Sequence, residues 1–265
     1  MADNLVESPN EERVKPLRFL GIDILPIGLP AAMDRIGTLA KQEQFSYVVT
    51  PNVDHMVNLH PKEPGPQLGP YREAYASAAL TLCDSRILKT LARLSGLQLT
   101  LVPGSDLTAA LFRDRLGAGD KVAVIGGDAD LLDKMRKLHP HPSYSQHIPP
   151  MGVLRNPEAM AEICRFVADS QADYVLFAIG SPQSEIIARQ CQLSGKCRGV
   201  GLCIGASLEF ITSAKKRAPQ WMQSAGLEWA FRLLSEPRRL WRRYLVDDMR
   251  IFPIYLRDRF GSNAG

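Results

Sequence analysis

Several features are missing from this 265-residue sequence, and each absence disfavours a class of protein. Its five cysteines are an odd number without a Cys-x-x-Cys pair, which favours reduced thiols in a cytosolic protein over a disulfide framework. No run of about 18 apolar residues occurs, so no segment is expected to span a bilayer. Residues 1–16 are polar and charged, without the apolar segment of a signal peptide. Any membrane contact is therefore expected to be peripheral.

Common cofactor motifs are missing as well. No Gly-x-Gly-x-x-Gly follows the first expected strand and no Gly-x-x-x-x-Gly-Lys-Ser/Thr occurs, which disfavours nicotinamide cofactors and P-loop chemistry. The five histidines lack ligand spacing with cysteines or carboxylates, so we expect no metal site and no cofactor. Asp128-Ala129-Asp130 has the Asp-x-Asp form of a metal site for nucleotide sugars. Because it follows two glycines and opens a helix, we prefer helix capping for it.

What the chain does have is a regular alternation of short apolar runs and amphipathic stretches. Most of the runs are continuous in Val, Ile and Leu, which is typical of strands buried on both faces. The alternation predicts an α/β fold over residues 17–211, a mainly parallel sheet flanked by helices, after a flexible leader at 1–16. Proline-rich stretches at 60–70 and 139–150 are expected to be loops. The expected strands are Phe19–Ile24, Tyr47–Thr50, Leu80–Cys83, Leu97–Val102, Val122–Ile125, Tyr174–Ile179 and Val200–Ile204, and the clearest helices are Asp128–Leu138, Asn156–Ser170 and Pro182–Leu193.

Residues 212–265 differ from the rest in charge and composition. They hold eleven Lys and Arg against five Asp and Glu, together with all three tryptophans, whereas the whole chain has a net charge of only +4. Aromatic residues beside basic ones favour a peripheral membrane contact, with Trp241, Tyr244, Phe252 and Tyr255 as candidates. A solvated basic helix that packs its tryptophans into the core is the simpler alternative. A nucleic-acid-binding module is a third, disfavoured because the charge is local and no nucleic-acid fold motif appears.

The turns after the expected strands are the places to look for a site, because open parallel sheets bind ligands beyond the carboxyl ends of their strands. Glycine or small residues follow most of these strands and let backbone N–H groups approach a diphosphate. Each turn alone is also explained by ordinary helix capping, so their concurrence on one edge is the stronger signal. Asp84 is either a general base that deprotonates a hydroxyl or a cap of the next helix. The other strand-end residues include Thr50, Asn52, Gly104, Ser105, Asp106, Gly126, Gly127, Gly180, Pro182 and Gln183.

These residues lie in stretches that resemble the bacterial WecG/TagA/CpsF glycosyltransferase family. The resemblance covers roughly residues 19–250 and is most specific in the block Arg-Ala-Pro-x-Trp, Gly-Leu-Glu-Trp and Glu-Pro-Arg-Arg. The matching stretches are 49–52, 83–84, 104–107, 124–127, 180–182, 205–210 and 216–244.

The resemblance implies a Rossmann-like core and a C-terminal appendage, residues 212–265, that touches the membrane and helps to complete the active site. It implies inverting transfer of a hexose (N-acetylmannosamine, its uronic acid or a glucose-type sugar) from a UDP-sugar to a sugar on polyprenyl pyrophosphate. Such reactions build teichoic acid linkers, enterobacterial common antigen and exopolysaccharides at the cytoplasmic face of the plasma membrane. Relatives suggest self-association, and no nucleic-acid partner is implied.

Motif matching also implies roles for single residues. Asp84 corresponds to the proposed base, with Thr50 and Asn52 beside it in the donor–acceptor pocket. The nucleotide-binding side corresponds to Gly127, Gln183 to Glu185 and Glu209. The arginines that reach the diphosphate correspond to Arg232, Arg239 and Arg242. The sequence departs from the family where Gln183-Ser184-Glu185 replaces a frequent Lys-Gln-Glu and where Glu209 replaces a frequent aspartate. The remaining alternatives are a metal-dependent nucleotide-sugar enzyme of another family and the nucleic-acid-binding protein considered above.

Overall fold

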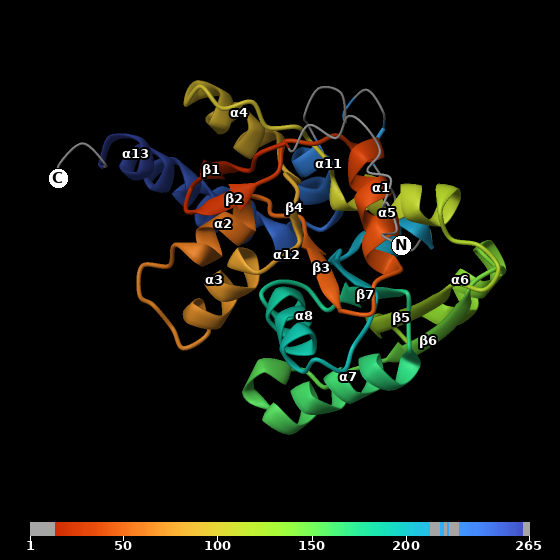
Figure 1. Ribbon diagram of the computed structural model, residues 1–265. Coiled ribbons are helices and arrows are strands. Elements are labelled where there is room, and N and C mark those ends of the chain that lie inside the picture. Colours follow the sequence, from red (N-terminus) through yellow and green to blue (C-terminus); the bar gives the residue numbers. More distant parts are fainter. Residues whose placement is uncertain (1–13, 213–217, 220–221, 223–227, 262–265) are drawn as a thin grey trace, which may run out of the picture.

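A six-stranded parallel sheet forms the centre of the computed structural model, which describes residues 14–212, 218, 219, 222 and 228–261 (Figure 1). The strand order is β4-β3-β8-β7-β5-β6, and all neighbouring strands run parallel. This confirms the predicted Rossmann-like α/β architecture. The strands are β3 (Ser46–Val49), β4 (Leu80–Thr81), β5 (Lys121–Gly126), β6 (Ser143–His147), β7 (Tyr174–Ala178) and β8 (Val200–Cys203).

Helices cover both faces of the sheet, with α7 and α8 on one side and α1 and α5 on the other (Figure 1). In β5, Val122 and Val124 belong to one apolar core, whereas Ala123 and Ile125 belong to the other. Burial on two faces explains why this strand is a continuous apolar run rather than an alternating one. The helices around the sheet are α1 (Leu29–Ala40), α2 (Val53–Leu59), α3 (Leu68–Ala76), α4 (Arg86–Leu94), α5 (Gly104–Asp114), α6 (Leu131–Leu138), a 3₁₀ turn at Val153–Arg155, α7 (Pro157–Ser170), α8 (Gln183–Leu193) and α9 (Ser207–Ile211).

Two expected strands lie outside the main sheet. The run Phe19–Ile24 is split into β1 (Leu17–Phe19) and β2 (Ile22–Ile24), which pair antiparallel around a turn whose Gly21 has a φ of +80°. The run Leu97–Val102 forms a single bridge, between Leu101 and Cys83. Its Val102 N–H donates to the carbonyl of Cys83 at 2.8 Å, so this segment covers the open edge of the sheet instead of extending it.

Strand β6 was missed because it is polar. Its sequence, Ser-Tyr-Ser-Gln-His, lies in the proline-rich stretch predicted to be a loop. The strand pairs with β5 only, at the edge of the sheet, where it needs little apolar surface. The other proline-rich loop is also shorter than expected, since α3 already begins at Leu68.

The C-terminal part returns to the core. It comprises α11 (Glu228–Ser235), α12 (Pro237–Arg242), a π-helical turn at Arg243–Asp247, a 3₁₀ turn at Asp248–Arg250 and α13 (Ile251–Gly261). Tyr255 of α13 is buried against Phe19 and accepts a hydrogen bond from Ser95 Oγ at 3.1 Å, so α13 lies beside β1 and α4 (Figure 1). None of the helices in the described ranges is long and apolar enough to cross a membrane.

Candidate active site

The direction of the chain connections reverses between β5 and β7. From β5 the chain passes through α6 to the outer strand β6, whereas from β7 it passes through α8 to β8 in the opposite direction. Ligands of open α/β sheets bind at such a reversal. Gly126 at the end of β5 is in register with Ala178 of β7, so the two glycine turns predicted from the sequence, at 126–127 and at 180, lie side by side at this reversal.

The turn after β5 requires glycine. Gly126 and Gly127 have φ values of +99° and +80°, and a methyl group on Gly126 would lie 2.8 Å from the carbonyl oxygen of Ala178. Strand β6 holds the turn from the other side, because Gln146 Nε2 donates to the carbonyls of Gly126 at 2.8 Å and Asp128 at 2.9 Å. A larger residue at Gly126 would therefore collide with the backbone of Ala178, and one at Gly127 with the side chain of Leu131.

The capping role expected for the Asp-x-Asp pair is wrong. Asp130 occupies the N-cap position of α6, but within the described part of the chain its side chain makes no capping hydrogen bond. The Asp128 carboxylate lies 3.7 Å from Lys134 Nζ in an exposed ion pair. Among the described residues, no group of three or more His, Cys, Asp or Glu side chains is placed to hold a metal ion.

Several of the predicted catalytic and binding residues converge on Gly104, the first residue of α5. A methyl group added there would lie 3.0 Å from Thr50 Oγ1, 3.6 Å from Ser207 Oγ and 3.8 Å from Asp84 Oδ2. These oxygens come from the turns after β3, β8 and β4, so three strand ends meet at the N-terminus of α5. The partial positive charge of that helix end favours negative charge on a neighbouring carboxylate or ligand.

Asp84 is not the cap of the helix that follows it. Ser85 has that role, because its Oγ accepts from the backbone N–H of Leu88 at 3.3 Å. The backbone N–H of Asp84 donates to the carbonyl of Pro51 at 3.0 Å, which joins the end of β4 to the Thr50–Asn52 turn. The half-buried Asp84 carboxylate is thereby held at the edge of the site by its neighbours.

A second polar chain runs from Asn52 to α8. Asn52 caps α2 through a capping box with His55, whose Nδ1 lies 2.8 Å from Asn52 Oδ1. The other ring nitrogen, Nε2, lies 3.4 Å from the carboxylate of Glu185, which is only 2% exposed. Burial by itself favours the neutral ring, but the hydrogen bond and negative charge of Glu185 outweigh it and raise the pKa of His55 above its ordinary value.

His55 was not among the residues selected from the sequence. All histidines were set aside because they lacked metal-ligand spacing, whereas the signal was the Asn-x-x-His spacing of an N-cap and its N3 partner. Through His55 the predicted residues Asn52 and Glu185, which are far apart in sequence, form one connected network.

The C-terminal part reaches the same network. Arg243 forms an ion pair with Asp54 of α2 at 3.1 Å, and Arg250 donates to the carbonyl of His60 at 2.9 Å. Burial, followed by the charge of Asp54, raises the pKa of Asp248 to about 6. The C-terminal part therefore contacts α2, whose N-cap is Asn52.

The glycosyl transferase WecG/TagA/CpsF family model matches residues 17–265. The chain belongs to this family. Membership implies glycosyl transfer in the synthesis of cell-surface polysaccharide, from a nucleotide-sugar donor to a lipid-linked acceptor. The match includes the sheet, the convergence at Gly104 and the C-terminal helices.

The remaining predicted residues of this glycosyltransferase are distributed along the same edge. The half-buried Ser105 and Asp106 lie in the first turn of α5, and Glu209 in the first turn of α9. Gly180, Pro182 and Gln183 form the turn into α8, where the neighbouring Ser181 Oγ lies 2.6 Å from Tyr71 OH. Arg242 is exposed on α12 and is not brought into the network described above, while the side chains of Arg232 and Arg239 lie outside the described residues.

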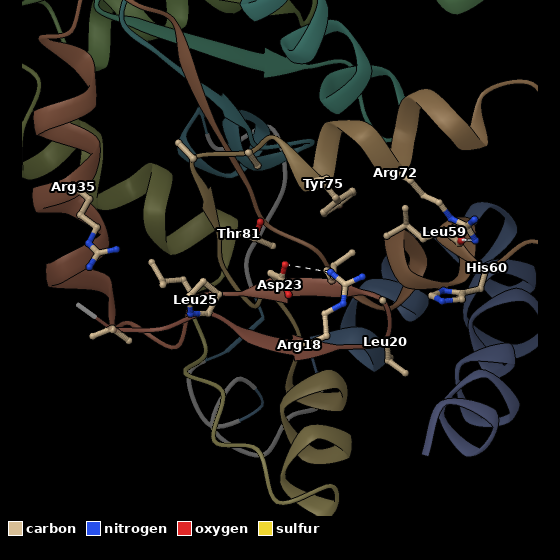
Figure 2. Close-up of a pocket in the computed structure, with 17 residues that line it drawn as sticks. Arg18, Leu20, Asp23, Leu25, Arg35, Leu59, His60, Arg72, Tyr75 and Thr81 are labelled. Atoms are coloured by element: carbon tan, nitrogen blue, oxygen red, sulfur yellow. Dashed lines mark hydrogen bonds and ion pairs between the residues drawn. The ribbon is translucent and has the colours of Figure 1, made fainter. Parts of the chain in front are cut away.

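A separate cavity of about 710 Å³ lies away from this edge (Figure 2). It opens between the β1–β2 hairpin, the last turn of α2 and α3, and Arg18, Arg35 and Arg72 line it. Arg18 is paired with Asp23 at 3.2 Å and Arg72 donates to the carbonyl of Leu59 at 3.0 Å. None of the predicted catalytic residues lines this cavity, which is therefore separate from the convergence at Gly104.

Proposed function

We propose that this protein is an inverting hexosyltransferase that moves a sugar from UDP to a sugar carried on polyprenyl pyrophosphate. The observation that carries the proposal is the convergence of Asp84, Thr50 and Ser207 around Gly104. A carboxylate among hydroxyl groups at a helix N-terminus suits the binding of an alcohol that must lose its proton. The family supplies the donor and acceptor classes, and the glycine turns at 126–127 and 180 supply room for a diphosphate.

The proposed chemistry divides between two parts of the edge. Asp84 takes the proton from the acceptor hydroxyl as its oxygen attacks the anomeric carbon from the side opposite UDP. The bond to the UDP oxygen breaks, and the charge that develops on the diphosphate is stabilised by backbone N–H groups of the glycine turns and by arginines of the appendage. General base catalysis of this kind contributes about 10²–10⁴-fold to the rate.

The lipid-linked acceptor explains a feature of the C-terminal segment. Within residues 241–260 seven large apolar side chains are exposed, among them Trp241, Phe252 and Phe260. Exposed arginines at 242, 257 and 259 accompany them. Apolar side chains beside basic ones fit the interface of an anionic bilayer. We therefore propose that residues 212–265 form an appendage that binds the cytoplasmic face of the membrane and brings the acceptor to Asp84.

The direct test is Asp84→Asn, which keeps the shape of the side chain but removes the base. With a panel of UDP-hexoses and a polyprenyl-pyrophosphate-linked sugar acceptor, we expect kcat to fall by about 10²–10⁴-fold. Binding of UDP, measured by the rise in Tm that a ligand causes, should persist.

Asp114→Asn is the matched control, since Asp114 is an exposed carboxylate on α5 that pairs only with its neighbour Arg113 among the described residues. Its kcat should equal that of the unchanged enzyme. Full activity of Asp84→Asn, or the absence of any UDP-sugar that supports transfer, would contradict the proposed reaction.

A further inference from the structure

Three of the five thiols gather at a place that the proposed transfer does not use. Cys164 lies on α7, Cys191 on α8 and Cys197 in the segment between α8 and β8. The Sγ atoms of Cys164 and Cys191 are 3.6 Å apart. Cys197 Sγ lies 3.6 Å from the carbonyl oxygen of Cys164 and 3.6 Å from the hydroxyl of Ser194. Three thiols from separate parts of the chain thus share one packing site.

The thiol pKa values of Cys164 and Cys197 are shifted in the opposite direction from those of Cys83 and Cys203. A hydrogen bond from Cys191 lowers the pKa of Cys197 to about 7, and the same donor lowers the pKa of Cys164. In contrast, burial raises the pKa of Cys83 to about 11 and the pKa of Cys203 well above its ordinary value. The same hydrogen bonds, followed by burial, raise the pKa of Cys191 well above its ordinary value. Because the thiolate is the nucleophile, Cys164 and Cys197 are the more reactive thiols and Cys191 is the weaker one. Cys164 is half-buried, which leaves it the most accessible member.

We propose that Cys164 and Cys191 form a hydroperoxide-sensitive thiol pair. The Cys164 thiolate attacks one oxygen of a hydroperoxide, its sulfur becomes a sulfenic acid, and the other oxygen leaves as hydroxide or alkoxide. The Cys191 thiol then attacks that sulfur, a disulfide forms and the sulfenic oxygen leaves as water. The peroxide is reduced by two electrons and the two thiols are oxidised by two.

Closure of the disulfide starts from two sulfurs that are already neighbours. A disulfide needs its sulfurs about 2.0 Å apart, so the present 3.6 Å separation must shrink by a rotation of side chains on two helices already in contact. The product would tie α7 to α8, the helix whose first turn carries Glu185. A thiol reductant would reverse the link, since thiol–disulfide exchange regenerates both thiols.

The test uses the full-length reduced protein and hydrogen peroxide at neutral pH. After quenching, free thiols are blocked with N-ethylmaleimide, disulfides are reduced, and the newly released thiols are labelled with the deuterated reagent for peptide mass spectrometry. We expect Cys164 and Cys191 to acquire the second label together, at least tenfold faster than Cys83 and Cys203 are oxidised. The last two serve as internal controls in the same sample.

Single variants separate the two steps. In Cys191→Ser, dimedone should trap sulfenic acid on Cys164, whereas Cys164→Ser should abolish the fast phase. Cys197→Ser should leave the disulfide in place. The inference is overturned if Cys164 is oxidised no faster than Cys83, if the disulfide links two molecules, or if no dimedone adduct forms in Cys191→Ser. No sugar donor or acceptor is involved, so these results are independent of the transferase assay.

Discussion

Replacing Gly104 by alanine tests whether the site depends on close packing at the start of α5. The added methyl carbon would lie 3.0 Å from Thr50 Oγ1, closer than most real contacts of this kind, and Thr50 has little freedom because it is only 6% exposed. Its hydroxyl lies 3.4 Å from the carbonyl oxygen of Cys203, to which it donates. To accept the methyl group, Thr50 must therefore give way by a few tenths of an ångström, whereas Ser207 Oγ and Asp84 Oδ2 would remain at ordinary contact distances.

Two opposing effects determine how much Gly104→Ala changes the free energy of unfolding. Alanine in place of glycine at a compatible backbone position stabilises a protein by about 0.4–1 kcal/mol. Overpacking of a tight site costs about 1–3 kcal/mol. We expect a net loss near 1 kcal/mol, equivalent to a fall in Tm of about 2–4 °C for a chain of this size. Turnover should fall by about tenfold in kcat, because Thr50 shifts by only a few tenths of an ångström, whereas a full 1 Å misplacement of a reacting group costs about 10²-fold.

Urea unfolding and the hexosyltransferase assay measure the two effects in the same preparations. Gly37→Ala is the control, since Gly37 lies within α1 and the added methyl group would meet only Arg115 Nη1, at an ordinary contact distance of 3.7 Å. That variant should be slightly more stable and fully active. The double variant Thr50→Ala with Gly104→Ala should show a favourable coupling of about 1 kcal/mol relative to the two single changes. If Gly104→Ala matches Gly37→Ala in stability and kcat, the convergence at Gly104 is not the site.

Two further predictions concern the C-terminal segment. The folded-state pKa of Asp248 is raised from 3.8 to about 6. The protonated carboxyl group therefore contributes stability below pH 4, and this contribution is lost as the pH rises to 6. Asp248→Asn should raise Tm at pH 7.5, by the equivalent of about 1–2 kcal/mol, and leave Tm unchanged at pH 4. Equal shifts at both values would show that Asp248 does not titrate in this way. Phe252→Glu with Leu256→Glu should reduce co-flotation with anionic vesicles at least tenfold, whereas Leu138→Glu, at an equally exposed site on α6, should not. Unchanged flotation of the double variant would rule out α13 as the membrane contact.

The parts of the fold that could be predicted from the sequence are those in which a local pattern reports a local environment. Val122–Ile125 and Tyr174–Ile179 are apolar at every position because β5 and β7 are covered on both faces. Asn156-Pro157 begins a helix because the Asn156 side chain can accept from the N–H of Ala159 without help from the rest of the chain. The proposed division at residue 212 remains a prediction.

Other parts depend on neighbours that a linear pattern does not identify. Strand β6 is polar because an edge strand needs one partner, and the same polarity in the sequence is typical of a loop. The run Leu97–Val102 is apolar, but it meets the edge of the sheet through one bridge rather than a ladder. Ser235 resembles an N-cap, yet it ends α11, where its hydroxyl donates to the carbonyl of Phe231 at 2.8 Å.

The candidate site also has features that the local sequence predicts and features that only the tertiary structure determines. Alternating strands and helices with small residues at the turns determine, by themselves, that Thr50, Asp84 and Gly126 lie on one edge, because all strands of a parallel sheet end on the same side. Which of these residues meet is decided only when β4, β3 and β8 are placed side by side, since that order brings the turns after them together at Gly104. The pairing of His55 with Glu185 and of Arg243 with Asp54 likewise joins residues more than a hundred positions apart. Contacts of that kind arise from the packing of whole elements, and no local spacing encodes them.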